Sequence, residues 1–159
     1  MFQATEQLAE AFEAAGIRFR VEDTSDRSLI AAEVATDYTA YIIRFISSSD
    51  SNDVAVRVHH YICFTKKQEM AVLRAANTCN RRYRFCKFAV NSEAKAVTVE
   101  YDLPTESENL GEAAVEIFKR FAQISNETYP IFIREIWGND EPEKEYASLG
   151  NIEFHDFEV

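Results

Sequence analysis

The chain has 159 residues, about the length of one domain, and can bury roughly two thirds of the surface that its unfolded form would expose. Hydrophobic residues make up 47% and charged residues 28%, which excludes a wholly disordered or collagen-like protein. The formal net charge of −10 at neutral pH repels phosphate and anionic lipid. We therefore expect a protein partner of unknown identity rather than nucleic acid or a membrane.

No export or membrane signal is visible in the sequence. The first residues, Met1 to Glu6, lack the basic and apolar regions of a signal peptide, and no run approaches the ~18 uncharged residues of a membrane span. The three cysteines, Cys63, Cys79 and Cys86, have no C-x-x-C spacing and fit reduced thiols better than disulfides or a zinc site. These features predict a cytoplasmic protein.

The hydrophobic period of the first half predicts one helix and four strands. Apolar residues at helical spacing predict a helix over about 2–15, which Gly16 would end as a C-cap glycine. The period then falls to two, and the short connections between the apolar runs favour an antiparallel meander. The four predicted strands cover about residues 17–22, 28–35, 39–47 and 54–64.

Strict alternation along the fourth predicted strand assigns each side chain to a face. Val54, Val58 and His60 would lie on one face, and His59 and Tyr61 on the other. Two adjacent histidines on opposite faces cannot chelate one metal ion between them. Clustered glycines, a nucleophile elbow and a complete calcium loop are also missing, so the sequence predicts no catalytic residue, cofactor or metal.

The second half predicts a helix, a hairpin and a long helix. Thr65 and Gln68 have the capping-box spacing that starts a helix over about 65–80. Strands over about 83–90 and 96–103 then form a hairpin. The long helix begins at Thr105 or Ser107 and runs to Gly138. Within it Pro130 predicts a kink or a break, and Gly111 weakens the helix by about 1 kcal/mol unless close packing needs it.

The order of the predicted elements is α-β-β-β-β-α-β-β-α. It indicates an α+β domain over residues 1–138, with about six antiparallel strands and helices packed on the sheet. Residues 139–159 contain seven acidic side chains and one lysine, and so carry −6 of the net charge. Their apolar residues leave two interpretations open: a solvated acidic terminus, or a segment that docks on the domain or on a partner.

Two features are candidates for interaction. A basic cluster follows the second helix, formed by Arg81, Arg82, Arg84 and Lys87. It either complements the C-terminus of that helix or provides a docking site for acidic groups, including the chain's own tail. At the end of the long helix, Trp137 and the isoleucines before it supply more apolar surface than one helix face can bury, which predicts a homodimer.

Four segments together resemble the YbjN-domain family of small bacterial proteins, regarded as sensory transduction regulators. They are the opening helix that ends at Gly16, the stretch Leu73 to Asn80, the hairpin Phe85 to Leu103, and the closing helix. The resemblance covers about residues 2–138 and implies a fold like that of class I type III secretion chaperones, often dimeric, which binds proteins without turning over substrates. The fourth strand before the second helix and the added tail depart from those chaperones.

Three functions remain open from the sequence. The first is a non-enzymatic protein-binding or regulatory module. The second is a small-ligand-binding or enzymatic protein with a pocket between sheet and helices. The third is a structural homodimer whose acidic tail tunes solubility. A pocket with converging polar groups would favour the second function, and a closed core with an apolar outer patch would favour the first.

Overall fold

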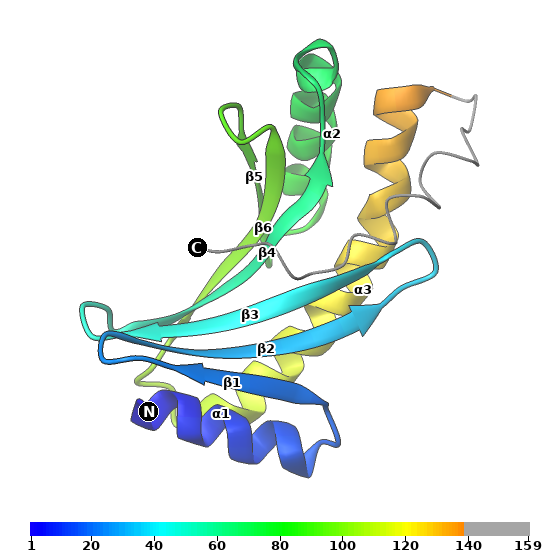
Figure 1. Cartoon of the computed structure of the whole chain (residues 1–159). Helices are drawn as coiled ribbons and strands as arrows, with labels where there is room; N and C mark the ends of the chain where they lie inside the picture. The colour runs from blue at the N-terminus through cyan, green and yellow to red at the C-terminus, as the bar shows by residue number, and fades with distance from the viewer. Residues whose placement is uncertain (139–159) are drawn as a thin grey trace.

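The computed structural model describes residues 1–138, which form three α-helices and a six-stranded sheet (Figure 1). The helices are α1 (Gln3–Ala14), α2 (Glu69–Arg82) and α3 (Leu110–Trp137). The strands are β1 (Phe19–Asp23), β2 (Arg27–Ala35), β3 (Ala40–Ser48), β4 (Asp53–Cys63), β5 (Lys87–Asn91) and β6 (Ala96–Pro104). The predicted α+β class and element order are confirmed. The predicted acidic tail, residues 139–159, lies outside the described residues.

The strands are ordered β1-β2-β3-β4-β6-β5, and every neighbouring pair is antiparallel. The first four strands form the predicted meander. After β4 the chain makes a short 3-10 turn at Lys66–Gln68, which has the predicted capping box at Thr65, and enters α2. It returns as β5 and β6, of which β6 pairs with β4. The β4–β6 pair therefore joins the four-stranded meander β1–β4 to the hairpin β5–β6 in one sheet.

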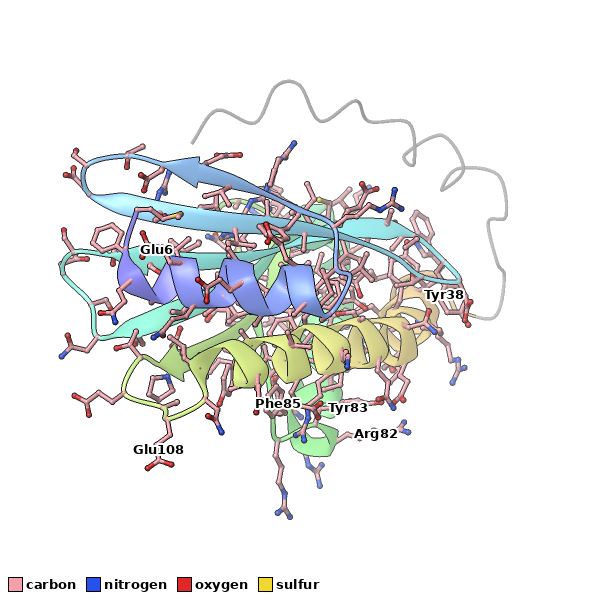
Figure 2. The ribbon with its side chains drawn as sticks, turned by 90° about the horizontal axis from the view of Figure 1, so that it is seen from below. Glu6, Tyr38, Arg82, Tyr83, Phe85 and Glu108 are labelled. Atoms are coloured by element: carbon pink, nitrogen blue, oxygen red, sulfur yellow. The ribbon has the colours of Figure 1, made fainter. Side chains whose placement is uncertain are left out.

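The helices pack on one face of the sheet. Figure 2 shows α1 and α3 on the same side of strands β1, β2 and β3. Phe12 of α1 and Phe45 of β3 are both almost fully buried, with ring centroids 5.1 Å apart in an edge-to-face contact. Burying side chains of this size stabilises the fold by about 1.5–3 kcal/mol each, which holds the helices on this face. No helix of residues 1–138 covers the opposite face, which we call the open face.

The crossing of α1 and α3 explains Gly111. A Cβ at this position would lie 2.7 Å from Cβ of Ala11 and 2.8 Å from the carbonyl oxygen of Gln7. Both distances are shorter than a normal contact, so the two helices approach closely only because position 111 has no side chain. Gly111 is therefore required by packing.

The alternation predicted for β4 is wrong beyond Val58. Val58 pairs with Val99 and Ile62 with Val97, so residues 59–61 of β4 lie opposite the single residue 98 of β6. His60 adopts a positive φ of 52°, and His59 and His60 are both exposed. Tyr61, predicted on the face opposite Val58, is buried in the core like Val58, with 5% of its own surface exposed. The bulge allows this because its extra residues break the period of two.

The predicted starts of one strand and one helix are wrong. Strand β5 begins at Lys87 rather than at residue 83, because Tyr83 and Phe85 pack against α3 and do not pair in the sheet. Helix α3 begins at Leu110 rather than at Thr105 or Ser107. The hydroxyl of Ser107 instead donates to the carbonyl of Pro104, 2.8 Å away, and closes a turn.

The break predicted at Pro130 is not present, because α3 runs from Leu110 to Trp137 through it. Pro130 has no N–H and cannot complete the helical hydrogen bond at its own position. On either side of it, Thr128 and Phe132 are fully buried. Their burial packs both halves of the helix on the core, so the helix continues through Pro130.

Candidate interaction face of the sheet

A single row of paired residues crosses the open face through all six strands. Because directly paired residues of an antiparallel sheet point to the same side, the row can be followed from the register. The cross-strand row consists of Arg20, Ala31, Arg44, Arg57, Glu100 and Lys87, from β1 to β5. Four of its six members are basic, and Arg44 and Arg57 lie directly opposite each other.

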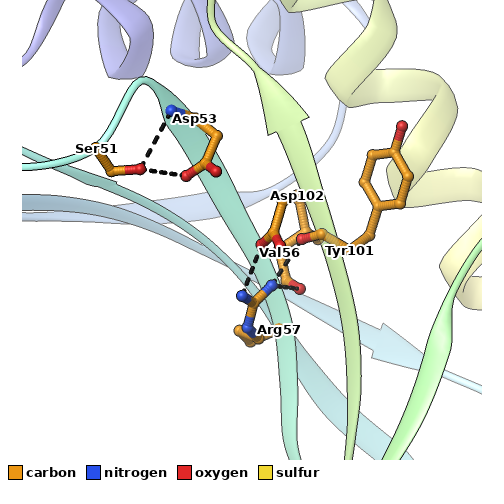
Figure 3. A network of polar contacts seen from close by, with 6 residues as sticks. All are labelled: Ser51, Asp53, Val56, Arg57, Tyr101 and Asp102. Carbon is orange, nitrogen blue, oxygen red and sulfur yellow. Dashed lines mark hydrogen bonds and ion pairs between the residues drawn. The ribbon is translucent and has the colours of Figure 1, made fainter.

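Arg57 is held by three acceptors (Figure 3). Its Nη1 donates to the carbonyl oxygens of Val56 and Tyr101, at 2.9 and 2.7 Å. Its Nη2 donates to Oδ1 of Asp102, 2.6 Å away, in an ion pair. The guanidinium of Arg57 is therefore fixed close to β4 and β6, and its charge is largely balanced within the sheet.

Arg44 has no such partners. It is half-buried, and within residues 1–138 it forms no ion pair and no side-chain hydrogen bond. Burial lowers the pKa of the Arg44 guanidinium from its ordinary value, and the charge of Arg20 lowers it further, while Glu22 opposes the shift. Glu22 itself forms an ion pair with Arg20 at 3.7 Å. The centre of the open face thus holds one unbalanced positive charge.

His59 adds to the same positive centre. Partial burial lowers the pKa of the His59 imidazole from its ordinary value, and the charges of Arg44, His60 and Arg57 lower it further. A histidine with a lowered pKa is neutral at physiological pH and becomes charged only on acidification. The positive centre can therefore gain a second charge when the pH falls or when an anion binds beside it.

Apolar side chains flank Arg44 on the open face. Leu29 of β2 is paired with Ile46 of β3, two positions along the strands from the cross-strand row. Ile42 lies two positions from Arg44 on its other side, opposite Glu33. Ile42 and Ile46 are half-buried. The open face therefore combines an unpaired cation with apolar neighbours, and it also includes Glu33 opposite Ile42 and Glu100 opposite Arg57.

The predicted basic cluster is divided between two sides of the molecule. Arg81 and Arg82 end α2, and the Arg82 guanidinium lies 5.3 Å from the ring centroid of Tyr83. The Tyr83 hydroxyl donates to Glu127 of α3, 2.7 Å away. Figure 2 shows Arg82, Tyr83 and Phe85 together beside α3. Arg84 is exposed in the connection, whereas Lys87 belongs to the cross-strand row.

Trp137, the last residue of α3, is 36% exposed. Two neighbouring isoleucines, Ile133 and Ile136, are partly buried against the core. Exposed apolar residues also occur on α2, where Met70 and Leu73 are one turn apart. The homodimer predicted from this apolar end remains a prediction, as does a binding role for the basic cluster.

Two surface hollows bear on the ligand-pocket alternative. One, of about 320 Å³, lies between the start of α1 and the β3–β4 connection, and includes Ser47, Ser51 and Asp53. The other, of about 680 Å³, lies along the α1–α3 crossing, and its lining includes Ala11, Glu112 and Lys119. Burial raises the pKa of the Tyr41 hydroxyl to about 12 and of the Cys86 thiol to about 12, but neither residue lines a hollow. Both residues are buried in the core.

Residues 1–138 contain no group of three or more His, Cys, Asp or Glu side chains placed to hold a metal ion. No helix in the same residues combines the length and the apolar character that crossing a bilayer requires. The arrangement that remains chemically distinctive is the positive centre of the open face.

The family model of YbjN, described as "Putative bacterial sensory transduction regulator", matches residues 4–134. The chain belongs to the YbjN family. The match extends from α1 through most of α3, so all residues of the cross-strand row lie in the YbjN domain. No curated protein matches the chain. The predicted family is confirmed, and its description is compatible with a regulatory or protein-binding module. The likeness of the YbjN domain to secretion chaperones remains a prediction.

The cross-strand row was not predicted from the sequence, although two of its members could be assigned to a face. Alternation within each strand already separates Arg20 and Arg57 from the core-facing residues. The missing information was the register, which brings Arg44 of β3 between them. The lengths of the hairpin connections carry some of that information, but bulges and loop conformation change it.

Proposed function

We propose that this YbjN domain is a non-enzymatic regulatory module that binds another protein, and that the open face takes an extended acidic segment of that partner. The observation that carries the proposal is Arg44, a half-buried cation without an acidic partner among residues 1–138. A partner carboxylate beside Arg44 would supply the missing acceptor.

The energetic argument favours a ligand that is both acidic and apolar. A hydrogen bond to a charged group contributes about 1.5–3 kcal/mol, more than a neutral one, and the low polarity around a half-buried group strengthens it. Covering the exposed parts of Ile42 and Ile46 would add about 25 cal/mol for each Å² of apolar surface removed from water. The charged hydrogen bond and the apolar burial together favour a partner segment with carboxylates next to apolar side chains.

A binding measurement tests the proposal directly. The probe is a short fluorescent peptide in which glutamate, serine and isoleucine alternate, and the control peptide has lysine in place of glutamate. Fluorescence anisotropy with the full chain should show binding of the acidic probe only. Arg44→Gln should weaken this binding about tenfold, since 1.4 kcal/mol corresponds to that factor.

Arg134→Gln is the matched control, because Arg134 is exposed on α3 and its substitution changes the net charge equally. It should leave the affinity for the acidic probe unchanged. Equal binding of both peptides, or equal weakening by both substitutions, would show that the contact depends on net charge alone and would overturn the proposed site.

A further inference from the structure

We propose that residues 139–159 of the same chain are an internal competitor for the open face. This inference rests on the proposed function, because it assigns a ligand in cis to the site around Arg44. A partner segment would then have to displace the chain's own acidic terminus, so the site would be partly closed until a partner with higher affinity arrives. The sequence indicates the basic cluster around Arg81 and Arg84 as a docking site for this segment; the position of Arg44 on the open face supports the different site that we propose.

Charge and composition make this segment the ligand type that the open face selects. It has seven carboxylate side chains and one lysine, a net charge of −6, whereas the longer segment 1–138 has a net charge of −4. It also contains apolar side chains next to its acidic ones, namely Tyr146, Leu149, Ile152, Phe154 and Phe157. Carboxylates beside apolar residues match an unpaired arginine surrounded by Leu29, Ile42 and Ile46.

The geometry of α3 places the start of this segment within reach. Asn126 of α3 donates to Asp37 in the β2–β3 turn, 3.0 Å away, so α3 passes that end of the sheet. From Asn126 the helix continues for about 18 Å to its end, at 1.5 Å per residue. From the β2–β3 turn, Arg44 lies about 13 Å along β3, at 3.3 Å per residue. A fully extended chain of the length of residues 139–159 spans ~70 Å. This is more than the distance from the end of α3 back to the β2–β3 turn and along β3 to Arg44.

The covalent connection strengthens a weak contact. A short flexible tether gives an effective concentration on the order of millimolar, so even a contact with millimolar intrinsic affinity would occupy the face for a substantial fraction of the time. Part of the attraction is electrostatic and is screened within about 10 Å at 0.1 M salt. Occupation should therefore decrease as ionic strength rises.

Paramagnetic NMR on the full chain tests where the segment lies. A nitroxide is attached at Ser148→Cys in a Cys63→Ser background, which leaves the buried Cys79 and Cys86 as the other thiols. The methyl signals of Ile42, Ile46 and Leu29 should broaden at low salt, whereas those of the core-facing helical residues Ile117 of α3 and Leu8 of α1 should broaden far less. Arg44→Gln should reverse the broadening on the open face.

The basic cluster provides the competing location. Arg81→Gln combined with Arg84→Gln should leave the broadening of Ile42 and Ile46 unchanged. If the amide signals around Arg81 and Arg84 broadened instead, and those of the open face stayed sharp, the segment would dock beside α2 and the inference would be overturned. Sharp signals at both places would also overturn it.

A second measurement separates this inference from the proposed function. The full chain with Glu141→Gln, Glu143→Gln, Glu145→Gln and Glu153→Gln should bind the acidic probe peptide about twofold more tightly than the unmodified chain, because a competitor with millimolar affinity at millimolar effective concentration occupies about half of the sites. Unchanged probe affinity, together with weakening by Arg44→Gln, would refute the internal competitor and leave the binding site intact. Failure of the probe to bind either chain would instead refute the proposed function.

Discussion

Arg44 lies directly opposite Arg57 in the β3–β4 pair, yet only Arg57 has acidic and carbonyl partners. Like charges directly opposite each other destabilise a sheet by up to about 1 kcal/mol. The pair is tolerated because Arg57 is directed towards Asp102 and the carbonyls beside it, so its charge is partly balanced. Arg44 has no such partner, so its positive charge at the centre of the open face is not balanced by an acidic group of residues 1–138.

This asymmetry predicts different effects on stability for the two arginines. Arg57→Gln should lower the free energy of unfolding by about 1–2 kcal/mol, because it removes an ion pair and two hydrogen bonds to carbonyls. Arg44→Gln should change it by less than about 0.5 kcal/mol, because relief from repulsion offsets the lost packing of the side chain. Urea unfolding measured by circular dichroism compares the two. A larger loss for Arg44→Gln would contradict the assignment of partners.

His59 should titrate below its ordinary pKa, and its titration should depend on Arg44. Because the folded-state pKa is lowered, the unfolded chain binds more protons at acidic pH; the neutral imidazole therefore contributes stability above about pH 6.5 that is lost as the pH falls through the folded pKa. Arg44→Gln removes a neighbouring positive charge and should raise the His59 pKa. NMR titration of the imidazole carbons measures this, and the His60 signal serves as the internal comparison. An unchanged His59 pKa would place Arg44 farther from the ring.

Gly111→Ala should destabilise the domain by about 1–3 kcal/mol although alanine favours helices by about 1 kcal/mol. The added Cβ would meet Ala11 at 2.7 Å and the carbonyl oxygen of Gln7 at 2.8 Å, so α1 and α3 must move apart. Combining it with Ala11→Gly should restore part of the loss, because the shorter of the two contacts, with Cβ of Ala11, is then removed. Thermal unfolding of the two single variants and the double variant gives the coupling energy. Purely additive effects would show that the helices do not meet there.

Tyr61→Phe should lower the free energy of unfolding by about 1–2 kcal/mol. The buried Tyr61 hydroxyl donates to the carbonyl oxygen of Ser125 at 2.6 Å and lies 3.0 Å from Oγ1 of Thr128, and these α3 groups would lose a partner. Tyr38→Phe is the control, because Tyr38 is 55% exposed, although its ring stacks on Tyr129. Urea unfolding should show little change for the control. Equal effects would mean that Tyr61 is not held by α3.

A chain that ends at Gly138 should fold without residues 139–159. The buried apolar side chains of residues 1–138 form one continuous cluster, and the YbjN match ends at residue 134. Circular dichroism should show unchanged helix content in residues 1–138 and cooperative unfolding. An unfolded or insoluble product would make the C-terminal segment part of the core and would remove the basis for treating it as a ligand.

Much of the architecture was predictable because it depends on local periodicity. A hydrophobic period near 3.6 indicates a helix and a period of two indicates a strand, and each shows which face of the segment is apolar. This was enough to place the elements in order and to infer an antiparallel sheet. The outward position of Arg20 and Arg57 was visible in the same way. Residues 83–86 were misassigned because aromatic side chains favour strands, yet Tyr83 and Phe85 pack on α3 instead.

The sequence by itself determined the class, the element order and the face on which each residue of a regular strand lies. The tertiary structure decided how the strands are registered, and with it the row that brings Arg44 between Arg20 and Arg57. It also decided that Tyr61 turns into the core at the β4 bulge and that α3 continues through Pro130. Faces follow from the period of one segment, whereas register, bulges and helix continuity depend on contacts between segments far apart in the chain, where burial outweighs local preference.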